Sequence, residues 1–202
     1  MNVLHKTSSG VTQVSMDAKH LSKRIITIKG EITEEAAIDF AGKLLELNME
    51  SEDEWITILI NSSGGEVNSG LMIYDAIVGS KAPVRAVVMG KAYSMGAVVF
   101  ACAKERLMLP NSELMLHQPL LAGRLAGNNA SSIQSISDSL LETKEKLNKL
   151  LASHTGRTLE ELDKATGYDH YFSPSEAIEF GLCEKQIDFA DVIDYANGME
   201  GE

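Results

Sequence analysis

The sequence predicts one α/β domain whose core is a parallel β-sheet. Short runs rich in β-branched residues alternate along the chain with segments that repeat apolar residues at helical spacing. Strand, helix, strand and helix in succession imply parallel strands joined by crossover helices. The chain has 202 residues, is 44% hydrophobic and shows no Pro- or Ser-rich linker, so residues 1–202 are expected to form a single domain.

The elements before residue 120 follow from these patterns. The strands are predicted at R-I-I-T-I-K, W-I-T-I-L-I, V-R-A-V-V-M, R-L-M-L and E-L-M-L-H. The first helix is predicted at E-E-A-A-I-D-F-A-G-K-L-L-E-L, where apolar residues recur at three- and four-residue steps. A second helix is expected from about Asn68 to Ser80, capped by Asn68 or Ser69, and a third begins at Ser94.

A long amphipathic helix is expected over residues 130–154. It carries Ile133, Ile136, Leu140, Leu147 and Leu150 on one narrow edge, with charged residues between them. At 1.5 Å per residue it would reach roughly 35 Å, which is longer than a compact domain of this size needs to cover its own sheet. It is either an ordinary surface helix or an arm that buries its apolar stripe against another subunit.

Composition excludes several classes of function. A formal net charge of −11 leaves no surplus of Lys and Arg to bind a phosphate backbone, so no nucleic-acid partner is expected. The start of the chain has no apolar signal region and no run approaches the roughly 20 apolar residues that cross a bilayer, so a cytoplasmic protein without membrane contact is predicted. Cys102 and Cys183 lack C-x-x-C spacing and are expected to be reduced, with neither disulfide nor zinc.

The stretch G-K-A-Y-S-M-G-A places Ser94 at a strand-to-helix bend. Open α/β sheets keep their sites at the carboxyl edge, where such a bend exposes its side chain. Serine is also a preferred N-cap, and capping alone would explain this residue.

His117 ends the run E-L-M-L-H at the same edge, one strand along. A base within reach is what a serine needs to become a nucleophile at neutral pH, although a lone histidine is more often a rim residue.

The stretch I-L-I-N-S-S-G-G-E-V runs from a buried strand into two glycines. Their freedom lets the backbone turn N–H groups outward, so Gly65 N–H and Met95 N–H are candidates to receive a developing oxyanion. A plain turn would look the same, and no phosphate-binding glycine motif is present. A carboxylate must orient the imidazole, and spacing does not choose among Asp163, Asp169 and Glu176.

Five stretches of the chain, taken together and in order, resemble the proteolytic subunit of the Clp protease. They are I-N-S-S-G-G, M-G-K-A-Y-S-M-G-A, L-P-N-S-E-L-M-L-H-Q-P, the long helix running into L-A-S-H-T-G, and S-P-S-E-A-I-E-F-G-L, within about residues 24–188. The resemblance implies that Ser94 is the nucleophile, His117 the general base and Asp169 the orienting carboxylate. It also implies that the amides of Gly65 and Met95 form the oxyanion hole.

The resemblance also implies a fold. This is the crotonase-like fold of repeated ββα units found in the Clp peptidases, with a head of roughly residues 21–128 and 155–190. The helix over 130–154 would be its protruding handle. The residues from 191 to 202 are acidic and weakly periodic, so we expect them to form a partly mobile tail.

Assembly and substrate are implied in the same way. The resemblance implies a homo-oligomer of two stacked heptameric rings, fed with unfolded polypeptides by an AAA+ unfoldase of the ClpX, ClpA or ClpC type. An extended substrate would add as a strand beside the segment from Gly65 to Val67 and the stretch after Pro119, with Gly64, Glu66, Val67 and Leu120 as substrate-binding residues. No metal or other cofactor is expected, because only the partner would use ATP.

The leading hypothesis is therefore an ATP-dependent Clp protease proteolytic subunit, a serine endopeptidase acting inside a barrel-shaped oligomer. A crotonase-type acyl-CoA hydratase or isomerase would share the backbone oxyanion device without needing a Ser–His pair. A catalytically silent or regulatory ring subunit is the third reading. Three positions depart from the family's pattern: Ser63 replaces a usual Pro, Tyr93 a small residue, and Tyr168 a common Arg.

Overall fold

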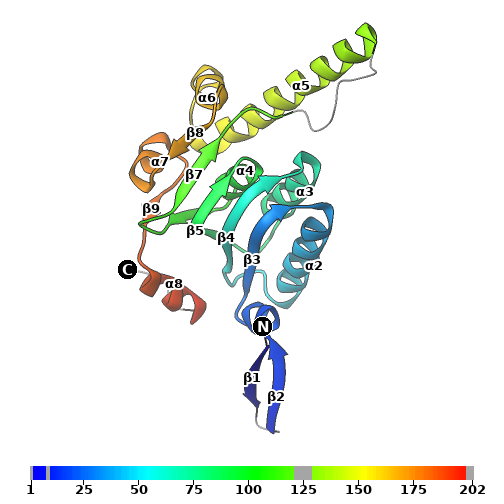
Figure 1. The fold of residues 1–202 in the computed structure, drawn as a ribbon. Coiled ribbons are helices and arrows are strands. Elements are labelled where there is room, and N and C mark those ends of the chain that lie inside the picture. Colours follow the sequence, from blue (N-terminus) through cyan, green and yellow to red (C-terminus); the bar gives the residue numbers. More distant parts are fainter. Residues whose placement is uncertain (1, 8–9, 121–128, 199–202) are drawn as a thin grey trace.

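The predicted parallel sheet forms the centre of the protein (Figure 1). The computed structural model of the chain describes residues 2–7, 10–120 and 129–198. The parallel strands, in the order in which they are hydrogen-bonded, are β3 (Ile25–Ile32), β4 (Ile56–Gly65), β5 (Val84–Tyr93), β6 (Glu105–Met108) and β9 (Lys185–Gln186). β3 to β6 coincide with predicted runs, because an apolar strand covered on both faces is the clearest strand signal in a sequence.

Strand β5 is shared between two neighbours, and this division positions the site. Its first half pairs with β6, and its last three residues pair in parallel with β7 (Glu113–Leu116). Gly90 separates the halves with φ of 128°, a conformation that L side chains rarely adopt. β8 (His170–Phe172) then runs antiparallel to β7. The ends of β5, β7 and β8 therefore meet at one corner of the sheet.

Helices surround this sheet. They are α1 (Met16–Leu21), α2 (Glu34–Glu50), α3 (Val67–Val78), α4 (Met95–Ala101), α5 (Ala130–Thr155), α6 (Leu159–Thr166), α7 (Pro174–Phe180) and α8 (Phe189–Ala196). α2, α3 and α4 cover one face, and the main core lies between them and the sheet (Figure 1). The predicted caps of α3 are wrong: Glu66 is its N-cap, and the Ser69 hydroxyl donates to the Glu66 carboxylate at 2.8 Å.

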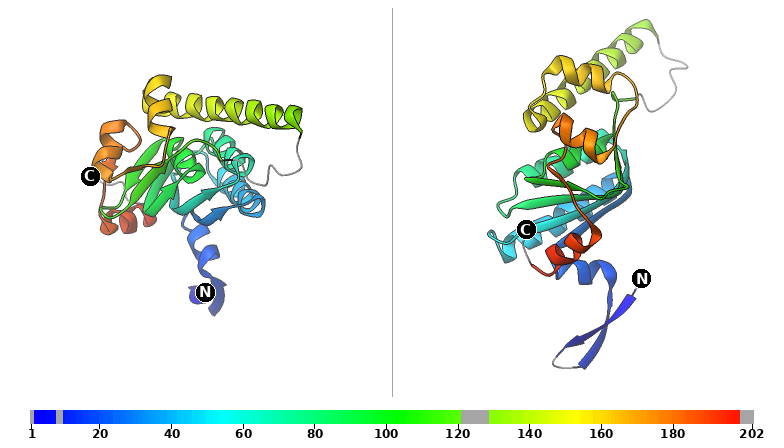
Figure 2. Two further views of the ribbon diagram at one scale, coloured as in Figure 1. Left: turned by 45° about the horizontal axis from the view of Figure 1, so that its top comes forward. Right: turned by 90° about the vertical axis from the view of Figure 1, so that its left-hand side faces the viewer.

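The long helix predicted over 130–154 is α5, and most of it stands clear of the domain (Figure 2). Only Leu147, Asn148 and Leu151, near its carboxyl end, are buried. Ile133 is 44% exposed and Leu141 61% exposed. The amino-terminal part of the apolar stripe is therefore not buried within its own chain, whereas Leu147 is buried and Leu150 packs against the main core. The unburied part favours the arm over the ordinary surface helix.

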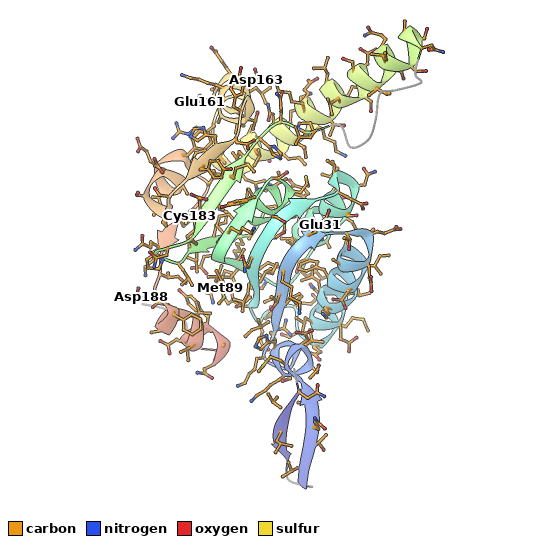
Figure 3. The ribbon with its side chains drawn as sticks, in the orientation of Figure 1. Glu31, Met89, Glu161, Asp163, Cys183 and Asp188 are labelled. Carbon is orange, nitrogen blue, oxygen red and sulfur yellow. The ribbon has the colours of Figure 1, made fainter. Side chains whose placement is uncertain are left out.

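The expectation of a partly mobile tail is wrong up to Ala196, because this segment forms α8. Val192 and Tyr195, three residues apart on one face of α8, are buried against Val87 of β5 and Leu107 of β6. Val87 points to the face opposite the main core, since side chains alternate along a strand. Met89, labelled in Figure 3, packs against the same cluster. Residues 199–202 of the predicted tail lie outside the described residues.

An N-terminal hairpin was not predicted. β1 (Asn2–Thr7) pairs antiparallel with β2 (Gly10–Ser15) and extends away from the head (Figure 2). Within the part of the chain that the structure describes, no helix has the length and apolar character needed to cross a bilayer.

Candidate active site

Ser94 occupies the bend between β5 and α4. Its φ of 52° and ψ of −122° form a strained conformation for a residue with a side chain. Its N–H donates to Met115 O at 2.8 Å and its carbonyl accepts from Ala97 N at 3.0 Å, which holds the bend in place. Ser94 is the N-cap of α4 by position, but its side chain makes no capping hydrogen bond. Capping therefore does not explain this hydroxyl.

The Ser94 hydroxyl instead meets His117. The distance from Ser94 Oγ to His117 Nε2 is 2.7 Å, a short hydrogen bond. Two adjacent parallel strands create this contact, because Tyr93 of β5 is paired with Met115 of β7 and both strands run toward the same edge. The His117 side chain is only 14% exposed, so the surrounding chain restricts the ring.

Asp169 lies on the other side of the imidazole. It immediately precedes β8, whose His170 is paired with Leu116, so the antiparallel ladder brings Asp169 beside His117. Asp169 Oδ1 is 3.5 Å from His117 Nδ1, and its side chain is 59% exposed. The other candidates are engaged elsewhere: Asp163 pairs with Lys144, and Glu176 accepts hydrogen bonds from Ser173 at the start of α7. Figure 3 shows Asp163 on α6.

The glycine pair packs its main chain against the start of α4. A Cβ on Gly64, whose φ is 86°, would lie 2.6 Å from Tyr93 O and 3.1 Å from Met95 N. Gly65 has φ of 156°, and the next N–H along, that of Glu66, donates to Ile32 O of β3 at 2.9 Å. Successive N–H groups in a strand point in opposite directions. The Gly65 N–H therefore points away from β3, toward the side on which Met95 begins α4.

A buried hydroxyl that the sequence reasoning missed supports this turn. The Ser62 hydroxyl donates to Gly30 O at 2.6 Å and accepts from Gly64 N at 3.1 Å. It thereby links β3 to the glycine pair. Its position in the strand gave a signal, because alternation places Ser62 on the buried side, where a hydroxyl needs partners.

A cavity of about 440 Å³ opens beside Ser94. Its wall includes the predicted substrate-contact residues Glu66, Val67 and Leu120, but not Gly64, which is buried behind Ser94. Glu31, at the carboxyl end of β3 and labelled in Figure 3, also contributes. Substrate contact was expected along the stretch after Pro119, and beyond Leu120 this stretch lies in residues 121–128, outside the described residues.

The floor of the cavity is apolar and comes from segments that sequence reasoning did not assign to the site. Its members are Val98 of α4, Leu116 of β7, and Leu147 and Leu151 of α5. Asn148 and Thr166 complete the wall, and the Thr166 hydroxyl donates to Leu162 O at 2.8 Å and Asn148 Oδ1 at 3.3 Å. The cavity therefore suits an apolar side chain.

Metal-ligating side chains and thiols are the other reactive groups in the described part of the chain. No group of three or more His, Cys, Asp or Glu side chains among those residues is arranged to hold a metal ion. Cys102 and Cys183 are free and buried, as predicted. Burial raises the pKa of each thiol to about 12, so neither is a thiolate nucleophile at neutral pH.

Comparisons with known proteins agree with this geometry. The family model described as Clp protease matches residues 8–189. A protein of Leuconostoc citreum (strain KM20), named ATP-dependent Clp protease proteolytic subunit, is 34% identical to this chain over 184 residues. The alignment covers 90% of this chain and 92% of that protein.

Proposed function

The chain belongs to the Clp protease family, and from this premise we propose that it is a serine endopeptidase that hydrolyses peptide bonds of unfolded polypeptides. The observation that carries the proposal is the 2.7 Å contact between Ser94 Oγ and His117 Nε2 at a strained strand-to-helix bend. Ser94 is the nucleophile, His117 the general base and Asp169 the carboxylate that orients the imidazole.

Acylation begins when Ser94 Oγ attacks the scissile carbonyl carbon while its proton passes to His117 Nε2. The carbonyl oxygen becomes an oxyanion, which accepts hydrogen bonds from the main-chain amides of Gly65 and Met95. His117 then gives the proton to the leaving amine, and the C–N bond breaks. Water, deprotonated by His117, hydrolyses the resulting ester in the same manner and restores Ser94.

The strained backbone supports the oxyanion role. Gly64 and Gly65 both have φ values that favour glycine, and the main chain of Gly64 lies against Met95 N. Donors fixed before the reaction need not reorganise as charge develops, and one such donor is worth about 10² to 10³ in kcat. The strain at Ser94 is maintained by its hydrogen bond to Met115.

The substrate binds as an extended strand beside Glu66 and Val67, with one side chain in the apolar cavity. Main-chain hydrogen bonds accept any sequence, whereas the Val98 and Leu151 floor favours an apolar residue at the cleaved bond. Such broad cleavage is safe in a cell only if access to Ser94 is restricted. We therefore include enclosure within an oligomer in the proposal.

The oligomer is two stacked heptameric rings, with α5 as the contact between them. The amino-terminal part of α5 supports this assignment, because Ile133 of the apolar stripe and Leu141 beside the stripe are open to solvent in the single chain. Leu140→Glu should split the double ring into single rings, measured as particle mass. Ser139→Glu, which adds the same charge at an exposed position one residue away, should leave the mass unchanged. An unchanged mass for Leu140→Glu contradicts the stacking through α5.

An AAA+ unfoldase of the ClpX, ClpA or ClpC type supplies unfolded chains and uses the ATP. The relative's name includes ATP dependence, while the cavity of this chain is built for a peptide. The cytoplasm is the proposed site of action, since two buried free cysteines suit a reducing compartment.

The proposal is tested with the purified full chain. A small fluorogenic peptide with an apolar residue before the cleaved bond should be hydrolysed without ATP, and Ser94→Ala should lower kcat by at least about 10⁴-fold. Hydration of crotonyl-CoA without peptide cleavage would instead identify an acyl-CoA hydratase. Assembled rings that cleave no peptide would identify a silent subunit.

A further inference from the structure

Tyr93 immediately precedes Ser94, yet its side chain belongs to a cluster outside the substrate cavity. Tyr93 of β5 is paired with Met115 of β7, and Met115 is paired with Tyr171 of β8. Residues directly opposite one another in a sheet point to the same face. One row of three side chains therefore crosses the three strands that end next to Ser94, His117 and Asp169.

Direct contacts join this row. The Tyr93 hydroxyl donates to Glu113 Oε1 of β7 at 2.5 Å. The Tyr93 ring meets the Tyr171 ring edge-on, with centroids 5.8 Å apart and planes at 86°. Lys91 Nζ lies 5.3 Å from the centroid of the Tyr93 ring. The hydrogen bond from the Tyr93 hydroxyl to Glu113 raises the pKa of Tyr93 to about 12, so the phenol keeps its proton at any working pH.

The strand at the far end of the row, β8, directly follows the candidate carboxylate. β8 is three residues long, and within the described residues it pairs with β7 alone. Asp169 directly precedes it, is 59% exposed and approaches His117 Nδ1 only to 3.5 Å. β8 is also held by Phe172, which is buried in the main core, and the segment before it by a hydrogen bond from Gln118 Nε2 to Gly167 O at 3.2 Å. The Asp169 side chain itself is exposed, so its distance from the imidazole depends on where the start of β8 lies.

We propose that Tyr93 is a positioning residue, which ties β8 to the nucleophile strand across β7 and so fixes Asp169 against His117. This inference rests on the proposed serine peptidase function. Glu113 fixes the hydroxyl end of the tyrosine, and Tyr171 receives its ring edge. Neither tyrosine lines the cavity, so the effect falls on the chemical step and leaves substrate binding unchanged.

The test compares Tyr93→Leu with Tyr93→Phe in the assembled enzyme. Tyr93→Leu should lower kcat for the fluorogenic peptide about tenfold with KM unchanged, as expected for the loss of an aromatic pair and a hydrogen bond. Tyr93→Phe keeps the ring edge and should recover most of kcat. Tyr171→Leu should reproduce the loss from the other side of the contact. Tyr168→Leu, at a tyrosine that is 90% exposed, is the matched control and should keep wild-type kcat.

A double-mutant cycle separates positioning from general destabilisation. In an Asp169→Asn background, Tyr93→Leu should cause no further loss in the rate at which a fluorophosphonate labels Ser94. An equal loss in both backgrounds, a raised KM, or an unchanged kcat in both Tyr93→Leu and Tyr171→Leu overturns the inference. Particle mass and melting temperature show whether each variant folds. A wild-type enzyme without peptidase activity would overturn the proposed function itself, whereas an active enzyme indifferent to Tyr93 would overturn only this inference.

Discussion

Replacing Gly65 with alanine tests the oxyanion hole most sharply. A Cβ at this position would lie 2.2 Å from Ile32 O and 2.7 Å from Ile32 N, both main-chain atoms of β3. Because neither contact can be relieved by a side-chain rotation, the glycine segment must move away from β3. Reaching the 3.4 Å of an ordinary contact with Ile32 O requires a shift of about 1.2 Å.

A shift of this size is large for catalysis. A donor must lie about 2.7–3.1 Å from the oxyanion to act, so a displacement of about 1 Å removes the Gly65 amide from the hole. The expected loss in kcat is about 10² to 10³-fold, equal to about 3–4 kcal/mol of transition-state stabilisation. The alanine also adopts φ of 156° at a cost of about 1–3 kcal/mol in stability.

The assay measures kcat and KM for a fluorogenic peptide, together with particle mass and melting temperature. Gly156→Ala is the control, because Gly156 has φ of 71° but no atom within 4 Å of an added Cβ. It should lose about 1–2 kcal/mol of stability to left-handed strain while keeping wild-type kcat. An assembled Gly65→Ala enzyme with wild-type kcat would refute the assignment of this amide to the oxyanion hole.

Three further predictions concern the cavity, a half-buried histidine and α8. Val98→Phe fills part of the cavity floor, so KM should rise about tenfold for a peptide with a large apolar residue at the cleaved bond and stay unchanged for one with alanine there. Equal effects on both peptides would contradict the assignment of this cavity to the substrate side chain. Burial lowers the pKa of His154, so the native state binds fewer protons than the unfolded state, and the free energy of unfolding should fall as pH drops below about 6.5. Urea unfolding of His154→Gln should show a smaller fall, and an identical fall would exclude His154 as a cause of this pH dependence. Ending the chain after Asp188 removes Val192 and Tyr195 from their buried positions, which should cost about 3–5 kcal/mol and expose an apolar surface to a hydrophobic dye; unchanged melting and no dye binding would show that α8 does not stabilise the head.

The sequence allowed prediction of the part of the site that depends on parallel strands. A β-branched run ending at Gly-rich or polar residues locates the carboxyl end of a strand, and all such ends in a parallel sheet meet at one edge. Ser94 and His117 were placed together on that ground, and their side chains are in contact. The two glycines were predictable because a strand followed by Gly64 and Gly65 needs their conformational freedom for its turn.

Asp169 could not be selected from the residues alone. The strand that positions it has three residues, too few for alternation to be recognised, and it returns antiparallel after a long helix. The chain contains 29 Asp and Glu residues, so the presence of an acidic residue does not by itself single out one position. The choice among Asp163, Asp169 and Glu176 therefore came from resemblance, and their partners in the structure explain why the other two are unavailable.

The cavity floor and α8 were missed for a different reason. Leu147 and Leu151 belong to an amphipathic helix whose buried face indicates packing without saying against what. In α8, Asp191 and Asp194 lie beside Val192 and Tyr195 and make the segment look like a solvated tail. The Asp191 carboxylate nevertheless accepts a hydrogen bond from the Asp188 N–H at 2.7 Å at the start of the helix.

The most direct measurement is the reaction of the assembled wild-type protein with a fluorophosphonate, followed by peptide mass mapping of the adduct. We expect stoichiometric modification of Ser94, no modification in Ser94→Ala, and much slower modification in His117→Ala. Labelling at another residue, or an unlabelled Ser94 in intact particles, would contradict the claim that this Ser–His contact is the reactive centre of the protein.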